Sequence, residues 1–62
     1  MKFKVRFKIG TRLGAVSIYT LREFCVCLVD RYSLTETELC TIFTMHPDEA
    51  FNNEDMQVTK AA

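Results

Sequence analysis

The sequence predicts a small α+β domain in which an N-terminal β-hairpin packs against two α-helices, in the order ββαα. Three observations predict it: cations alternate with apolar residues over 2–9, glycines stand at 10 and 14, and two later threonines each precede a glutamate by three residues. A chain of 62 residues has room for one core. We therefore assign residues 1–51 to a single domain and residues 52–62 to a flexible polar tail.

The opening segment carries the strongest strand signal. Successive side chains of a strand point to opposite faces, so residues 2–9 give one apolar face and one basic face. The basic side chains are Lys2, Lys4, Arg6 and Lys8. The glycine-bounded turn that follows, which carries Arg12, predicts a hairpin with residues 15–19 as its second strand.

The side-chain phase predicts a register for this hairpin. A four-residue loop from Gly10 to Leu13 places Ile9 opposite Gly14 and keeps the apolar residues of both strands on one face. In that register Tyr19 lies across from Lys4, so we expect Tyr19 to be the aromatic residue of the basic face.

A capping box predicts where the first helix begins. Thr20 and Glu23 have the spacing at which each side chain bonds the other residue's backbone N–H. Apolar residues then recur at helical spacing, and we expect a helix from Leu21 to about Tyr32.

A second capping box, Thr35 with Glu38, predicts a helix from Glu36 to about Met45. Its β-branched and aromatic residues leave an alternative open, in which residues 39–45 form a third strand. Pro47 disfavours helix at the residue before it. Residues 47–51 could add one short helical turn.

Opposite charges divide the chain. Six Lys and Arg and no acid precede residue 23, whereas residues 23–62 contain two Lys and Arg and eight acids. The neutral total therefore hides a bipolar molecule, in which an acidic surface formed by Glu36, Glu38, Asp48 and Glu49 accompanies the basic strand.

The sequence offers no pattern for catalysis or metal binding. Cys25 and Cys27 diverge by about 200° on a helix, so they cannot hold one ion, and Cys40 and His46 do not form a second close pair. Both glycines join strands, whereas a phosphate-binding loop leads into a helix. We expect no enzyme activity, metal or cofactor.

Cysteine content and hydropathy suggest a location. Three cysteines cannot all pair within one chain, so we interpret them as reduced small hydrophobes of a reducing compartment. No apolar run approaches the roughly 20 residues that cross a bilayer. We expect a cytoplasmic protein that does not contact membranes.

The basic strand has three interpretations. Its cations could protect a sheet edge from unwanted pairing, bind nucleic-acid phosphates, or dock on an acidic protein surface. We favour a non-enzymatic interaction module, an inhibitor or adaptor of the type that phages and mobile elements encode, bound to a charged surface of a larger host or cognate protein. The alternative is a small DNA- or RNA-binding regulator that dimerises through its first strand.

Overall fold

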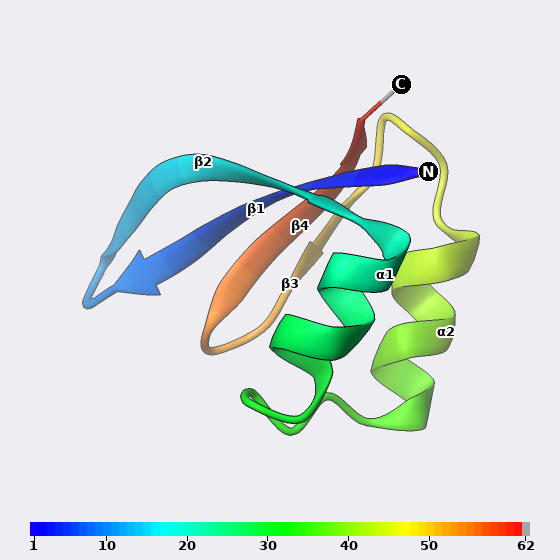
Figure 1. The fold of residues 1–62 in the computed structure, drawn as a ribbon. Helices are drawn as coiled ribbons and strands as arrows, with labels where there is room; N and C mark the ends of the chain where they lie inside the picture. Colours follow the sequence, from blue (N-terminus) through cyan, green and yellow to red (C-terminus); the bar gives the residue numbers. More distant parts are fainter. Residues whose placement is uncertain (62) are drawn as a thin grey trace.

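The computed structural model describes residues 1–61, which form a four-stranded antiparallel sheet with helices on one side (Figure 1). In chain order the elements are β1 (Lys2–Ile9), β2 (Arg12–Thr20), α1 (Leu21–Phe24), the π-helix η1 (Cys25–Val29), α2 (Glu36–Thr44), β3 (Ala50–Asn52) and β4 (Met56–Ala61). The strand order is β2-β1-β4-β3. The predicted α+β class, the hairpin and the two helical segments are confirmed.

The C-terminal third differs from the prediction. Residues 56–61, expected in a flexible tail, form β4, which lies between β1 and β3. Residues 50–52 form β3, although residues 50 and 51 were expected in a short helical turn and residue 52 in the tail. The alternative strand over 39–45 is wrong, because α2 occupies this region. The sheet therefore has twice the strands of the predicted hairpin.

Both capping boxes are present and explain where the helices begin. The Thr20 hydroxyl accepts a bond from the Glu23 N–H at 3.1 Å, and the Glu23 carboxylate accepts one from the Thr20 N–H at 2.9 Å. Thr35 and Glu38 repeat the pattern with the same two distances. These bonds satisfy N–H groups that a helix start would otherwise leave unpaired.

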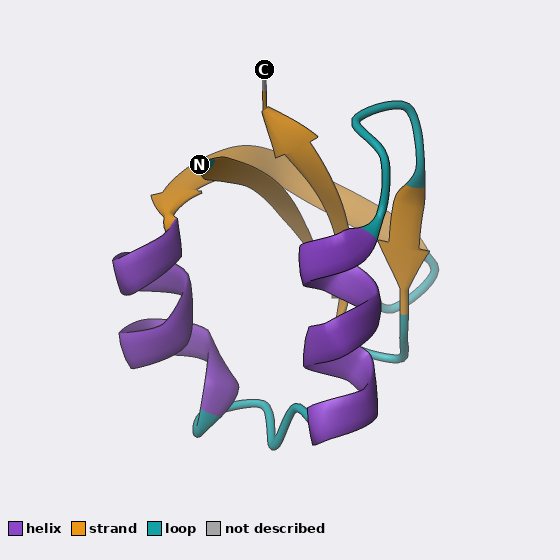
Figure 2. Ribbon diagram, turned by 90° about the vertical axis from the view of Figure 1, so that its right-hand side faces the viewer, coloured by secondary structure: helices purple, strands orange, loops and turns teal. Residues whose placement is uncertain are grey.

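The first helical segment ends earlier than predicted. It continues from α1 as the π-helix η1 and stops at Val29 rather than near Tyr32. The chain then reverses at Ser33, which has a left-handed φ of 51°. The Leu34 N–H bonds the Val29 carbonyl at 3.0 Å and closes this turn. The two helical segments consequently run side by side beneath the sheet (Figure 2).

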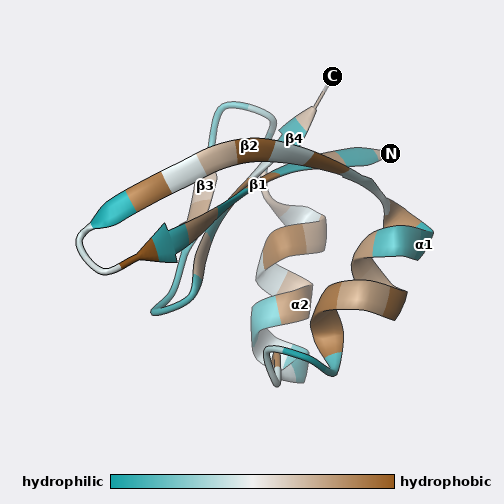
Figure 3. Ribbon diagram, turned by 60° about the vertical axis from the view of Figure 1, so that its left-hand side comes forward, coloured by the Kyte–Doolittle hydropathy of each residue, from teal (hydrophilic) through white to brown (hydrophobic). Residues whose placement is uncertain are grey.

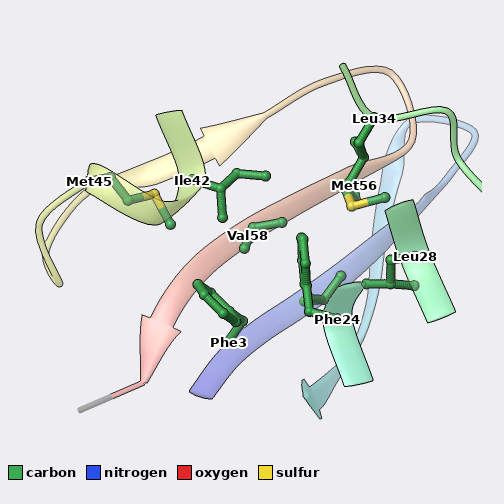
Figure 4. Close-up of a cluster of buried hydrophobic side chains, with 9 residues drawn as sticks. Phe3, Phe24, Leu28, Leu34, Ile42, Met45, Met56 and Val58 are labelled. Atoms are coloured by element: carbon green, nitrogen blue, oxygen red, sulfur yellow. The ribbon is translucent and has the colours of Figure 1, made fainter. Parts of the chain in front are cut away.

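The core lies between the sheet and the helices (Figure 4). Its buried side chains are Phe3, Val5, Phe24, Leu28, Leu34, Ile42, Met45, Met56 and Val58. The Phe3 ring lies 5.0 Å from Phe24 and 5.9 Å from Phe43, centroid to centroid, and so joins β1 to both helices. Aromatic pairs at such separations add about 0.5–1.5 kcal/mol beyond the burial of their area.

The hairpin register differs from the predicted one. Lys4 pairs with Ile18 and Arg6 pairs with Val16, so the pairing is shifted by one residue. The connecting turn contains two residues rather than four, because Gly10 adopts a φ of 62° that tightens it. An irregularity in the pairing between Arg6 and Lys8 then changes which β2 residues lie opposite β1. It has the character of a β-bulge, in which one strand carries an extra residue.

Candidate interaction surface

The sheet face turned away from the helices is uncovered, and we call it the open face. Because Phe3 and Val5 of β1 point into the core, their neighbours and the residues paired with those neighbours occupy the opposite side. The open face comprises Lys2, Lys4 and Arg6 of β1, Val16, Ile18 and Thr20 of β2, Gln57, Thr59 and Ala61 of β4, and Ala50 and Asn52 of β3. This set holds three cations but neither a carboxylate nor an aromatic ring.

The one-residue register shift determines what surrounds the cations. Tyr19 pairs with Phe3 and packs against the core, so its predicted place on the basic face is wrong. Val16 and Ile18 take its place beside the cations, and their side chains are 53% and 59% exposed. Figure 3 shows the hydrophobic stretches along β2. The open face therefore combines a central basic row with an apolar row at one edge.

The interpretation of the basic strand as a protected sheet edge is also wrong. β1 lies between β2 and β4, so its backbone groups already have partners on both sides. Cations discourage unwanted pairing only where a strand has a free side. The charges on β1 therefore need another explanation.

The predicted basic residues differ in how freely they can reach a ligand. The Arg6 Nε donates to the Gly14 carbonyl at 2.8 Å, which fixes the guanidinium above the irregular part of the hairpin. Lys8 Nζ donates to the Asn53 carbonyl at 2.6 Å, beside the turn that joins β3 to β4. Lys2 and Lys4 are exposed. Arg12 is exposed at the far end of the hairpin, across from Ile9.

Within residues 1–61, no hydrogen bond joins a cation of this row to a carboxylate, although Glu23 lies close enough to Lys2 for the two charges to interact. The hydrogen bonds that lysine and arginine side chains make within residues 1–61 end on backbone carbonyls, of Gly14, Asn53 and Phe43. The positive potential of the open face is consequently available to a ligand.

The predicted acidic surface is divided in two. Glu36 and Glu38 lie in the first turn of α2, whereas Asp48 and Glu49 lie in the loop beyond its other end. A helix of this length is about 13 Å long. Glu49 is held by a 2.9 Å bond from the His46 N–H. The four acids therefore do not form one surface.

A different acidic group was not apparent from the sequence. Glu38 lies with Glu54 and Asp55 around a shallow cavity of about 280 Å³, which Tyr32 and Asn53 also line. Asn53 donates to the second Glu38 oxygen at 3.4 Å. These residues come together because the turn between β3 and β4 lies beside the start of α2, a contact that local sequence patterns do not reveal. Within residues 1–61, no His, Cys, Asp and Glu side chains gather in a group able to hold a metal ion.

The cysteines do not serve as core hydrophobes. Cys25, Cys27 and Cys40 are free thiols and are all exposed, so the interpretation of these residues as small hydrophobes does not place them in the core. The apolar stripe of the first helix is supplied by Phe24 and Leu28 instead.

Neither helical segment of the described chain combines the length and apolar character needed to cross a membrane. No family model matches the chain, and neither a curated protein nor a solved structure is found to be similar to it. Function must therefore be inferred from the surface itself.

Proposed function

We propose that this protein is a non-enzymatic interaction module that binds an acidic surface of a larger protein through the open face. The observation that carries the proposal is the row of Lys2, Lys4 and Arg6 on a sheet face without a carboxylate. Charges of one sign arranged on a rigid sheet steer a partner of opposite charge and fix its register.

The spacing of the row defines the partner further. Alternate residues of a strand lie about 6.6 Å apart, so the three cations extend over about 13 Å. Carboxylates on successive turns of a helix, or on alternate residues of a strand, have a similar spacing. A partner carrying such a row can meet all three cations at once.

The apolar row supports a protein partner over a nucleic acid. Val16 and Ile18 expose more than half of their side-chain surface beside the cations, and burying it contributes about 25 cal/mol per Å². Sites for single-stranded nucleic acids usually combine cations with aromatic rings on which bases stack, and the open face has no such ring. Phosphate binding by the same cations is the competing function.

We assign one activity to the module: it covers a functional surface of its partner. A small domain that covers such a surface acts as an inhibitor, or as an adaptor if it also recruits a second protein. Phages and mobile elements encode proteins of this type, and the host or cognate protein they bind would be the partner here.

The test is affinity capture from nuclease-treated lysate of the source cell, with three forms of the full chain. The first is the wild type, and the second is the variant Lys2→Glu/Lys4→Glu. The control variant, Arg22→Glu/Arg31→Glu, makes the same change in net charge on the helical side of the molecule. Circular dichroism establishes that all three forms are folded.

We expect the wild type and the control to recover the same partner. The open-face variant should recover at least about tenfold less of that partner, because two charge contacts are lost. Capture that depends on intact nucleic acid would assign the face to phosphate binding instead. Equal recovery by all three forms would show that the open face is not the contact surface.

A further inference from the structure

The two edges of the sheet are unequal. β3 forms one edge and has three residues, whereas β2 forms the other and has nine. From Leu13 to Thr20 the β2 edge carries no charged residue and no proline. Natural sheets usually protect a long edge with such residues, because unpaired backbone groups invite another strand.

Two hydrogen bonds at the end of β2 identify the backbone groups on its free side. The Leu21 N–H bonds the Met1 carbonyl at 3.2 Å, so Leu21 points toward β1. Alternation along the strand directs Ser17 and Tyr19 the same way and directs Val16 and Ile18 outward. Thr20, of the outward set, gives its N–H to Glu23 rather than to β1. Val16 and Ile18 therefore present free N–H and C=O groups.

The same two residues carry the exposed apolar side chains of this edge, on the open face. Hydrogen-bonding groups and apolar surface thus coincide at Val16 and Ile18. A strand that pairs here satisfies the backbone groups and packs against the outer flank of both side chains, while their remaining surface stays on the open face.

We propose that a second copy of this chain occupies the β2 edge, so that two sheets join into one through antiparallel β2–β2 pairing. A two-fold axis between the two Ser17 residues places Val16 of each protomer opposite Ile18 of the other. Each such pair exchanges two N–H···O=C bonds. This inference concerns the sheet edge and does not depend on the proposed function.

Electrostatics favour a second copy over an acidic strand. The row adjacent to an added strand is formed by residues 13–20 of β2, which are uncharged. Arg6 of β1, which is paired with Val16, already donates to the Gly14 carbonyl. An acidic strand opposite Val16 and Ile18 would therefore meet no free cation of β2. In the two-fold arrangement the basic rows of the two β1 strands lie three strand spacings apart, about 14 Å. This separation exceeds the screening length of about 8 Å at physiological ionic strength, so the two rows repel each other weakly.

The first test is the mass of the full chain in solution. Sedimentation equilibrium from about 10 µM to about 1 mM covers the affinities of modest interfaces. We expect a mass that reaches twice 7.2 kDa. A mass that remains at one chain throughout overturns the proposal. Growth beyond two copies also overturns it, because pairing of β2 with β3 of the next molecule does not close.

Variants test the register. Val16→Lys/Ile18→Lys sets ammonium groups opposite each other across the axis and should weaken association by about tenfold or more. Val16→Glu/Ile18→Lys makes each cross-axis pair oppositely charged and should restore association relative to the lysine variant. Val26→Lys, at a helical position 70% exposed, is the control and should leave the mass unchanged. Equal association in all three overturns the proposed interface.

Amide exchange supplies a readout that does not require a substitution. The Val16 and Ile18 amides should exchange rapidly at low protein concentration and become protected at high concentration. The Ser17 and Tyr19 amides, which point toward β1, should be protected at both. Val16 and Ile18 amides that remain unprotected when the mass has doubled would locate the dimer contact elsewhere.

Discussion

Lys60 Nζ lies 2.6 Å from the carbonyl oxygen of Phe43 and donates a hydrogen bond to it. Lys60 is in the last strand, β4, and Phe43 is in the last turn of α2. Helix C-termini leave carbonyls without partners and carry partial negative charge. The lysine therefore binds the end of α2 to the centre of the sheet.

Replacing this lysine should destabilise the domain. Lys60→Met retains most of the aliphatic chain but removes the charged donor, and we expect a loss of about 1 kcal/mol in the free energy of unfolding. In a domain of this size that corresponds to about 4–8 °C in melting temperature. Lys4→Met, on the open face, is the control and should change stability by less than about 0.5 kcal/mol. Equal effects of the two substitutions would contradict the role of the Phe43 contact.

Acid should weaken the two helix caps. Hydrogen bonds from the backbone and side chain of Thr20 lower the pKa of Glu23 below its ordinary 4.5. The Thr35 backbone and the Asn53 side chain do the same to the pKa of Glu38. Because both pKa values are lowered in the folded state, their stabilising contribution is present above pH 4.5 and is lost as pH falls through the folded values.

The measurement is the melting temperature as a function of pH. Glu23→Gln/Glu38→Gln retains an acceptor oxygen at each cap but does not titrate, so its stability should fall less steeply below pH 4.5 than that of the wild type. Asp30→Asn/Asp48→Asn, at two exposed positions outside the caps, serves as a comparison with the same change in charge. A steeper or identical acid dependence in the cap variant would rule out this contribution.

Neighbouring residues of β4 should respond oppositely to the same substitution. Val58 is fully buried. A carboxylate at this position would either be buried in the apolar core or force the domain to open. The stability of a domain this small is only about 3–9 kcal/mol, so we expect Val58→Asp to unfold it. Thr59 pairs with Lys4 on the open face, and Thr59→Asp should be tolerated. The dispersion of amide signals in NMR spectra distinguishes the two outcomes, and a folded Val58→Asp variant would contradict the placement of β4.

The turn of the first hairpin should discriminate between substitutions at Gly10. Its φ of 62° lies in the left-handed region, which alanine adopts at a cost of about 1–2 kcal/mol. Nothing lies within 4 Å of an added side-chain carbon, so the cost is conformational rather than steric. Gly10→Asn should recover part of the loss, since asparagine tolerates this region better. Denaturant unfolding of Gly10→Ala and Gly10→Asn measures the difference in their free energies of unfolding. Equal stability of the two variants would argue against a left-handed residue at this position.

Local signals in the sequence predicted the beginnings of both helices. A capping box needs only residues three apart, and both boxes form as expected. The alternation over 2–9 likewise predicted β1, because period-two patterning reflects which face is buried. Phe3 and Val5 point into the core, and Lys2 and Lys4 point away from it.

Features that depend on distant residues or on turn geometry were missed. β4 pairs with β1 across 49 to 59 positions, so nothing near Met56 or Val58 identifies its partner, although their alternation is a weak strand signal. The hairpin register was wrong because a two-residue turn and a bulge replaced the expected four-residue loop. That shift moved Tyr19 off the basic face and brought Val16 and Ile18 to it.

The pairing of β1 with β4 has a consequence for synthesis of the protein. After the last residue of β2 has been synthesised, roughly 40 further residues must be added before β4 is complete, which takes about 2–8 s at 5–20 residues per second. During this interval Phe3 and Val5 of the nascent chain lack the β4 side chains that later cover them. The growing polypeptide is thus a candidate for transient chaperone binding until its final strand is released.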